Sequence, residues 1–229
     1  MILFPPAKVN LGLNILSKRN DGFHEIETCM YPIPWCDALE INKSESFSFQ
    51  STGLHIDVNS TNNLVVKAYE LLKEAFQLPP VNIHLHKVIP MGAGLGGGSA
   101  DAAYTLKMLN VIFELGLSPK ELKNYAALLG SDCAFFIDNT AAICTGRGEI
   151  IKPLDFTLSD LFLVLIKPNI HISTKEAYAG VTPKAISKPI KDILFNPDNL
   201  VDELVNDFEN SIFPNHPKLG EIKAELYGK

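Results

Sequence analysis

A glycine-rich segment in the middle of the chain limits the choice of fold more than any other feature. Residues Pro90–Ala103 read Pro-Met-Gly-Ala-Gly-Leu-Gly-Gly-Gly-Ser-Ala-Asp-Ala-Ala, with five glycines within seven consecutive positions. The alternation of Val81–Leu85 predicts a strand before this segment, and a helix is predicted to begin after it at Ser99 or Asp101. Glycines let backbone N–H groups approach an anion closely, and the helix start adds unpaired N–H groups and a positive dipole end. We therefore expect a phosphate-binding loop.

Two commoner phosphate loops are excluded by their surroundings. A Walker A loop ends in Gly-Lys-Ser/Thr, and no lysine lies between Lys87 and Lys107. The segment does match Gly-x-Gly-x-x-Gly, but a dinucleotide-binding unit continues from its helix into a parallel strand. Here Ser118–Leu129 predicts a second helix, with Ser118 as its N-cap. The loop is thus of a third kind, in which Ser99 is placed to hold a phosphate oxygen or Mg²⁺.

Apolar periodicity predicts the other elements of the chain. The expected strands are 9–15, 28–35, 38–41 and a hairpin of 141–145 with 149–154, together with a buried strand at Leu161–Lys167. The expected helices are 64–76, capped by Asn62 or Asn63, and 174–179, 199–212 and 219–226.

Composition limits the classes of partner. The net charge of −6 argues against nucleic-acid and anionic-membrane binding, and the longest apolar run, Leu161–Ile166, is far shorter than a membrane span. Only Arg19 and Arg147 are arginines, so backbone N–H groups and lysines are the expected phosphate ligands. The four cysteines show neither zinc-site nor redox spacing, which favours reduced thiols in a cytoplasmic protein.

Five segments together resemble the GHMP kinase superfamily. The glycine-rich segment is similar to the family's second motif, and four further stretches occur in the family's order across nearly the whole chain: Pro6–Leu13, Asp21–Ile26, Leu129–Asp132 and Ile172–Tyr178. The resemblance implies an α+β fold of two domains. Residues 1–155 would form an N-terminal α/β domain with a left-over-right core of sheet and helix. Residues 156–229 would form a smaller C-terminal α/β sandwich.

The resemblance implies an ATP- and Mg²⁺-dependent kinase for a small molecule with a cytidine diphosphate moiety. The reaction would be phosphorylation of the 2-hydroxyl of 4-diphosphocytidyl-2-C-methyl-D-erythritol, in the non-mevalonate route to isoprenoid precursors. The expected ATP-binding residues are Pro90, Met91, Gly92, Ala93, Gly94, Leu95, Gly96, Gly97, Gly98 and Ser99, with Asn63 near the adenine. Taken alone, Asn63 is explained equally well as a helix cap.

Asp132 and Lys8 match the family's catalytic positions. A carboxylate near the acceptor hydroxyl takes its proton, and a lysine keeps that carboxylate ionised and stabilises developing charge. Without the resemblance, Asp132 would be interpreted as a helix N-cap and Lys8 as a solvated strand residue. Asn10, Phe23 and His24 match acceptor-binding positions, with Phe23 stacking on cytosine, His24 contacting its edge and Asn10 binding the methylerythritol hydroxyls. His84 and His86 are expected to be surface residues.

One family feature is missing from this chain. The family carries a third glycine-rich segment, of Gly-Ser-Gly type, near the C-terminus, and no Gly-Ser-Gly occurs in these 229 residues. The second domain is therefore expected to be truncated and one wall of the phosphate site to be absent. Two alternatives stay open: a homoserine- or mevalonate-type GHMP kinase, and a nucleotide-binding protein without catalysis. Oligomeric state does not follow from the sequence.

Overall fold

The structure, a computed structural model, describes residues 1–56, 63–196 and 200–228. The chain forms two compact units that alternate along the sequence. Unit 1 comprises Met1–Val9, Met30–Ala142 and Pro153–Asp155, and unit 2 comprises Asn10–Cys29, Ile143–Lys152 and Phe156–Lys229. The expected boundary between residues 155 and 156 coincides with one point where the chain passes from unit 1 to unit 2. A division by that single cut stays a prediction.

Unit 1 contains a four-stranded sheet of order β1-β4-β6-β5. Its strands are β1 (Ile2–Leu3), β4 (Ala38–Lys43), β6 (Val81–Lys87) and β5 (Ser48–Gly53). β6 pairs antiparallel with β4, where Ile41 faces Ile83, and parallel with β5, where Ser51 faces Leu85. The predicted alternation of β6 is confirmed, because its apolar residues are buried while Asn82 and His86 are exposed and His84 is partly exposed.

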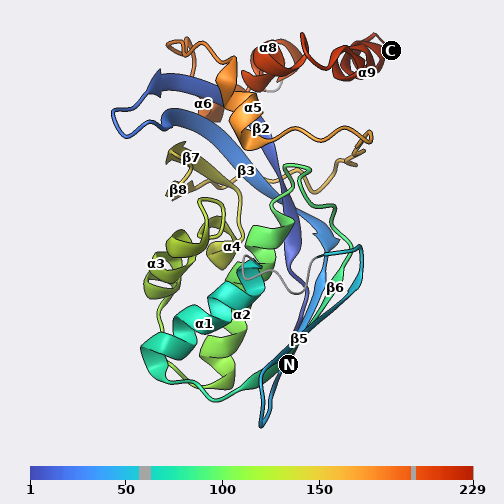
Figure 1. The fold of residues 1–229 in the computed structure, drawn as a ribbon. Helices are drawn as coiled ribbons and strands as arrows, with labels where there is room; N and C mark the ends of the chain where they lie inside the picture. The colour runs from blue at the N-terminus through green and yellow to red at the C-terminus, as the bar shows by residue number, and fades with distance from the viewer. Residues whose placement is uncertain (57–62, 197–199, 229) are drawn as a thin grey trace. The chain divides into compact units, whose positions relative to one another are not determined.

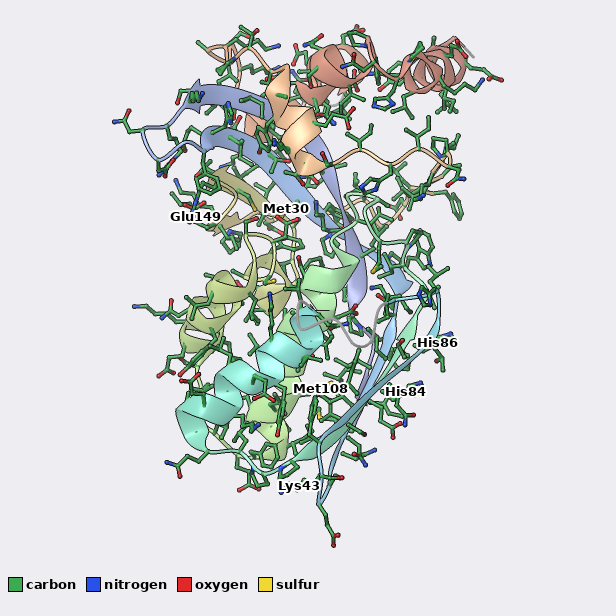
Figure 2. The ribbon with its side chains drawn as sticks, in the orientation of Figure 1. Met30, Lys43, His84, His86, Met108 and Glu149 are labelled. Atoms are coloured by element: carbon green, nitrogen blue, oxygen red, sulfur yellow. The ribbon has the colours of Figure 1, made fainter. Side chains whose placement is uncertain are left out.

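The described part of unit 1 contains four helices. They are α1 (Leu64–Phe76), α2 (Gly97–Ile112), α3 (Pro119–Leu129) and α4 (Phe135–Asp138). α1 and α2 lie against one face of the sheet (Figure 1). Figure 2 shows Met108 of α2 inside this layer, fully buried, and His84 and His86 on the outer side of the sheet. The prediction of α3 directly after α2, which excluded a dinucleotide-binding unit, is confirmed.

Local signals account for the ends of these helices. Asn63 caps α1 by accepting a hydrogen bond from the backbone N–H of Val65 at 2.9 Å, as predicted. Asn62, the alternative cap, lies outside the described residues. Ser118 and Glu121 form a reciprocal capping box at the start of α3. α2 begins at Gly97, two residues before Ser99.

A second sheet has the order β2-β3-β7-β8. Its strands are β2 (Pro6–Lys18), β3 (His24–Cys36), β7 (Ala142–Gly146) and β8 (Ile150–Pro153), so the predicted hairpin near Gly146-Arg147-Gly148 is confirmed. The long strands β2 and β3 each contribute residues to both units, because the chain passes from unit 1 to unit 2 after Val9 and back to unit 1 after Cys29. In unit 2, Leu13, Ile15 and Ile26 of these strands form an apolar core with Tyr178, Val181 and Phe208.

The helices of unit 2 are short. They are α5 (Thr174–Ala179), α6 (Ile190–Leu194), α7 (Leu200–Glu203), α8 (Phe208–Ile212) and α9 (Pro217–Tyr227). The prediction of one helix over 199–212 is wrong, because the backbone between α7 and α8 pairs with β2 instead. The N–H of Leu13 donates to Val205 O at 2.8 Å, and the N–H of Asp207 donates to Leu13 O at 2.9 Å.

The predicted buried strand at Leu161–Lys167 is also wrong. Residues 154–173 contain neither helix nor strand, and the side chains of Leu161–Ile166 are between 39% and 100% exposed. A strand needs a neighbouring strand for its backbone groups, and none of the described residues pairs with this segment. Among the helices that the structure describes, none is long and apolar enough to cross a bilayer.

Candidate active site

The glycine-rich loop joins β6 to α2 in unit 1, and its glycines adopt backbone angles that other residues avoid. Gly92, Gly94 and Gly96 have φ values of 66°, 73° and 69°. Gly96 is the residue directly before α2. A Cβ atom on Gly96 would lie 2.9 Å from the Phe136 ring, whereas a Cβ on Gly94 would meet nothing within 4 Å. The loop is therefore close-packed at its helix end and open at its middle.

Lys8 and Asp132 form an ion pair next to this loop. The backbone N–H of Lys8 donates to Leu95 O at 2.9 Å, which attaches β2 to the loop. The Lys8 Nζ lies 3.4 Å from Asp132 Oδ2, with the lysine side chain 6% and the aspartate side chain 30% exposed. The solvated-lysine interpretation is thus wrong. The N-cap interpretation of Asp132 is wrong too, because α4 begins at Phe135 with Ala134 before it.

Ser99 lies in the first turn of α2, partly buried. Its hydroxyl is hydrogen-bonded to the Cys133 thiol. Burial raises the pKa of this thiol to about 11, so Cys133 stays protonated at neutral pH and is no nucleophile. All four cysteines are among the described residues, and none forms a disulfide.

A buried ionic cluster behind the loop was missed by the sequence reasoning. Lys87 Nζ contacts the carboxylates of Asp37 and Asp101, the latter at 2.7 Å. Burial raises the pKa of the Asp101 carboxyl to about 7, against the opposing attraction of Lys87. The alternation of Val81, Ile83 and Leu85 places Lys87 on the buried face, which was the available signal.

The predicted acceptor residues lie in unit 2. The Asn10 side-chain amide donates to Thr28 Oγ1 at 2.9 Å, and that hydroxyl donates to Gly12 O at 2.6 Å. His24 is stacked on Tyr178, with ring centroids 4.9 Å apart. The Phe23 ring is 53% exposed, and the Arg147 guanidinium lies over it in a cation–π contact, 4.9 Å from the ring centroid. The stacking of His24 on Tyr178 and the position of Arg147 over the Phe23 ring were not predicted from the sequence.

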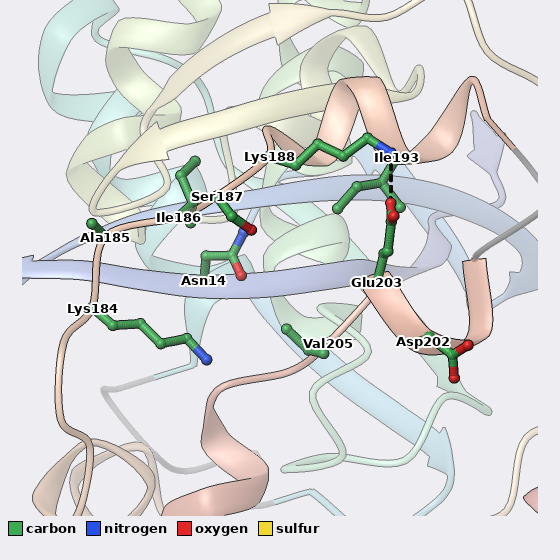
Figure 3. A pocket seen from close by; sticks show the side chains of 10 residues that line it. All are labelled: Asn14, Lys184, Ala185, Ile186, Ser187, Lys188, Ile193, Asp202, Glu203 and Val205. Atoms are coloured by element: carbon green, nitrogen blue, oxygen red, sulfur yellow. Dashed lines mark hydrogen bonds and ion pairs between the residues drawn. The ribbon is translucent and has the colours of Figure 1, made fainter.

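Unit 2 also contains a cavity of about 630 Å³ (Figure 3). Asn14 of β2 lies on one side, and the other lining residues are Lys184–Lys188, Ile193 of α6, Asp202 and Glu203 of α7, and Val205. Its lysines are paired, Lys188 with Glu203 at 2.6 Å and Lys184 with Asp207 at 2.8 Å. The cavity therefore offers little uncompensated positive charge to a phosphate.

Comparison with known proteins decides the family. Residues 63–147 match the GHMP kinases N terminal domain. The chain is 52% identical over 229 residues to the 4-diphosphocytidyl-2-C-methyl-D-erythritol kinase of Cytophaga hutchinsonii, covering 99% of this chain and 85% of the relative. It is 50% identical to the kinase of the same name from Parabacteroides distasonis, covering 99% and 84%. The chain belongs to the 4-diphosphocytidyl-2-C-methyl-D-erythritol kinase family of GHMP kinases.

Solved structures agree with this family on the fold. The crystal structure of a 4-(cytidine 5'-diphospho)-2C-methyl-D-erythritol kinase superposes with a TM-score of 0.80 at 31% identity, covering all of this chain and 83% of that one. A crystal structure of mevalonate kinase gives a TM-score of 0.57 at 16% identity, which shows a shared fold alone. The predicted α+β GHMP kinase fold is confirmed.

The kinase family implies a divalent cation with ATP. Within the described ranges, no group of three or more His, Cys, Asp or Glu side chains is arranged to hold a metal. Mg²⁺ in kinase sites keeps water ligands and binds chiefly to substrate phosphates, with few protein ligands. A single hydroxyl such as that of Ser99 at the start of α2 is compatible with this mode.

Proposed function

We propose that this kinase transfers the γ-phosphoryl group of ATP to the 2-hydroxyl of 4-diphosphocytidyl-2-C-methyl-D-erythritol, in the non-mevalonate route to isoprenoid precursors. The observation that carries the proposal is the Lys8–Asp132 ion pair at 3.4 Å beside a glycine-rich loop. A phosphate cradle alone would fit many nucleotide-binding proteins. The partly exposed Asp132 carboxylate beside the buried Lys8 ammonium adds a group that could accept the proton of an alcohol substrate.

Asp132 is the proposed general base. It accepts the proton of the acceptor hydroxyl as the oxygen attacks the γ-phosphorus and the bond to the β-phosphate oxygen breaks, leaving ADP. Lys8 holds this carboxylate and stabilises negative charge on the transferred group. Because Lys8 is 6% exposed, its charge acts with little screening by water.

The residues from Pro90 to Ser99 are proposed to bind the phosphates of ATP. Their backbone N–H groups and the positive end of α2 attract the anion. Asn63 remains a proposed neighbour of the adenine, in addition to its observed role as a cap. Ser99 is the residue proposed to hold Mg²⁺, which when bound would neutralise negative charge on the phosphates of ATP.

Unit 2 supplies the proposed acceptor-binding residues. Phe23 presents an exposed ring on which the cytosine stacks, and His24 reads the edge of the base. Asn10 binds the methylerythritol hydroxyls through its side-chain amide. We also propose a cytoplasmic location, supported by four cysteines without disulfides, and a small-molecule partner in place of nucleic acid, supported by the net charge of −6.

The reaction can be tested by measuring ADP release from ATP with the cytidylated acceptor. Wild-type protein should release ADP, and Asp132→Asn should lower kcat by roughly 100-fold or more, because general-base catalysis contributes about 10²–10⁴-fold. The dissociation constant for ATP should change little. Asp138→Asn, which alters another lysine-paired carboxylate of unit 1, serves as the control and should retain turnover.

Four outcomes would contradict the proposal. ADP release no faster than background with wild-type protein would refute the kinase activity, and ATP-dependent thermal stabilisation without product would favour a non-catalytic nucleotide-binding protein. Faster turnover of mevalonate or homoserine would assign a different acceptor. Loss of ATP binding in Asp132→Asn would mean that Asp132 is a nucleotide ligand and not the base.

A further inference from the structure

Three ionisable side chains are fully buried behind the glycine-rich loop. Asp37, Lys87 and Asp101 are exposed by only 0%, 2% and 2% of their side-chain areas. They come from the residue before β4, the last residue of β6 and the second turn of α2. The proposed phosphate transfer uses none of them.

The cluster holds both ends of the loop. At the entry, Asp37 Oδ1 accepts hydrogen bonds from the backbone N–H groups of Val88 at 2.6 Å and Ile89 at 2.8 Å. At the exit, Lys87 Nζ donates to Asp101 Oδ2 at 2.7 Å. The ammonium also lies under the first residue of α2, since a Cβ on Gly97 would be 2.9 Å from Lys87 Nζ. One ionic cluster thus links the two ends of the loop formed by residues 88–97.

Stability alone does not account for this arrangement. Two carboxylates share one ammonium, and Asp101 Oδ1 is buried without a hydrogen-bond partner among the described residues. A buried polar atom without a partner costs free energy, and well-packed apolar residues often stabilise a protein as well as a buried ion pair does. The cluster is therefore weak evidence for stabilisation, whereas its hydrogen bonds to both ends of the loop are specific.

We propose that Asp37, Lys87 and Asp101 are positioning residues that fix the glycine-rich loop in its phosphate-binding conformation before ATP arrives. This inference rests on the proposed function of the loop. The ten loop residues 88–97 are held in one conformation before ATP binds, so they lose little conformational entropy on binding. The unfavourable entropy of ordering the loop therefore reduces the ATP affinity less. The cluster touches neither reacting group, and its effect passes through the backbone of residues 88–97.

Asp101→Ala tests the proposal because it should change KM for ATP without changing the other kinetic constants. The variant should raise KM for ATP about tenfold and leave kcat and KM for the cytidylated acceptor within about twofold. A contribution that stabilises bound ATP equally in the ground state and the transition state affects KM and not kcat when it is lost. Asp101→Asn keeps an oxygen that accepts from Lys87 and should restore most of the ATP affinity. Glu70→Ala, which removes a lysine-paired carboxylate on the surface of α1, is the matched control and should match wild type.

Hydrogen exchange of the ligand-free protein gives a second measurement that needs no catalysis. The amides of residues 92–98 should exchange about tenfold faster in Asp101→Ala than in wild type, with little change in unit 2. Faster exchange in a protein that binds ATP but releases no ADP would support the positioning role while refuting the proposed reaction.

Unchanged exchange with unchanged KM for ATP would overturn the inference. So would an equal increase in KM for both substrates, which indicates general destabilisation. If Asp101→Ala does not fold, Asp101→Ser keeps a short polar group and is measured instead by the same criteria.

Discussion

Gly96 and Gly94 allow the loop geometry to be tested one residue at a time. Both have positive φ, so alanine at either position costs about 1–2 kcal/mol of backbone strain. Only the Cβ at position 96 would meet the Phe136 ring, at 2.9 Å. Gly96→Ala should therefore lower the free energy of unfolding by about 1–3 kcal/mol more than Gly94→Ala does, because overpacking adds to strain. Urea unfolding of the two variants measures this difference, and equal losses would mean that the ring moves aside freely.

At the scale of residues, the sequence predicted side chains better than it predicted their partners. The family motifs identified Lys8 and Asp132, which the structure brings to 3.4 Å. The alternation of β6 could have placed Lys87 on the buried face, although this prediction was not made. Its pairing with Asp37 was not predictable, because 50 residues separate the two and only the register of β4 against β6 brings them together. Contacts between distant segments depend on topology, which no local pattern encodes.

At the scale of elements, Asp207 explains why the predicted helix over 199–212 is interrupted. Its side chain is 4% exposed, accepts from the backbone N–H of Ile15 at 2.8 Å and pairs with Lys184. Asp207→Ala would leave this buried N–H without an acceptor, so we expect a loss of about 1–3 kcal/mol in unfolding free energy. Asp207→Asn keeps the acceptor oxygen and should lose less.

The control for this prediction is Asp202→Ala in α7, where the side chain is exposed. Chemical denaturation of the three variants should rank Asp207→Ala as the least stable. If Asp202→Ala is equally destabilised, the interruption of the helix does not depend on the contact with β2.

Elements with complete local signals were predicted with their boundaries. Asn63 at the start of α1 and the Ser118–Glu121 capping box of α3 supply hydrogen bonds within one turn, so they act in any tertiary context. Leu161–Lys167 has only an apolar run, which suits a buried strand when a neighbouring strand exists. Whether a neighbouring strand exists depends on the tertiary structure, which the local sequence does not encode. The prediction of a strand was therefore wrong for this segment.

At the scale of the whole molecule, the two units are expected to divide the ligands between them. The phosphate loop with Lys8 and Asp132 belongs to unit 1, whereas Phe23, His24 and Tyr178 belong to unit 2. Hydrogen exchange should therefore show a non-hydrolysable ATP analogue protecting residues 88–101, and cytidine diphosphate protecting residues 20–26 and 174–181. Contacts and backbone ordering slow exchange locally, so each ligand marks the unit that binds it.

Uridine diphosphate is the matched control for this experiment, because it carries the same phosphates and differs at the base edge that His24 is proposed to read. It should protect residues 20–26 more weakly than cytidine diphosphate at equal concentration. Protection of residues 88–101 alone by cytidine diphosphate would mean that it binds as a second nucleotide at the ATP loop. Phe23 and His24 would then have no part in acceptor recognition, and the structure would no longer support a cytidylated acceptor.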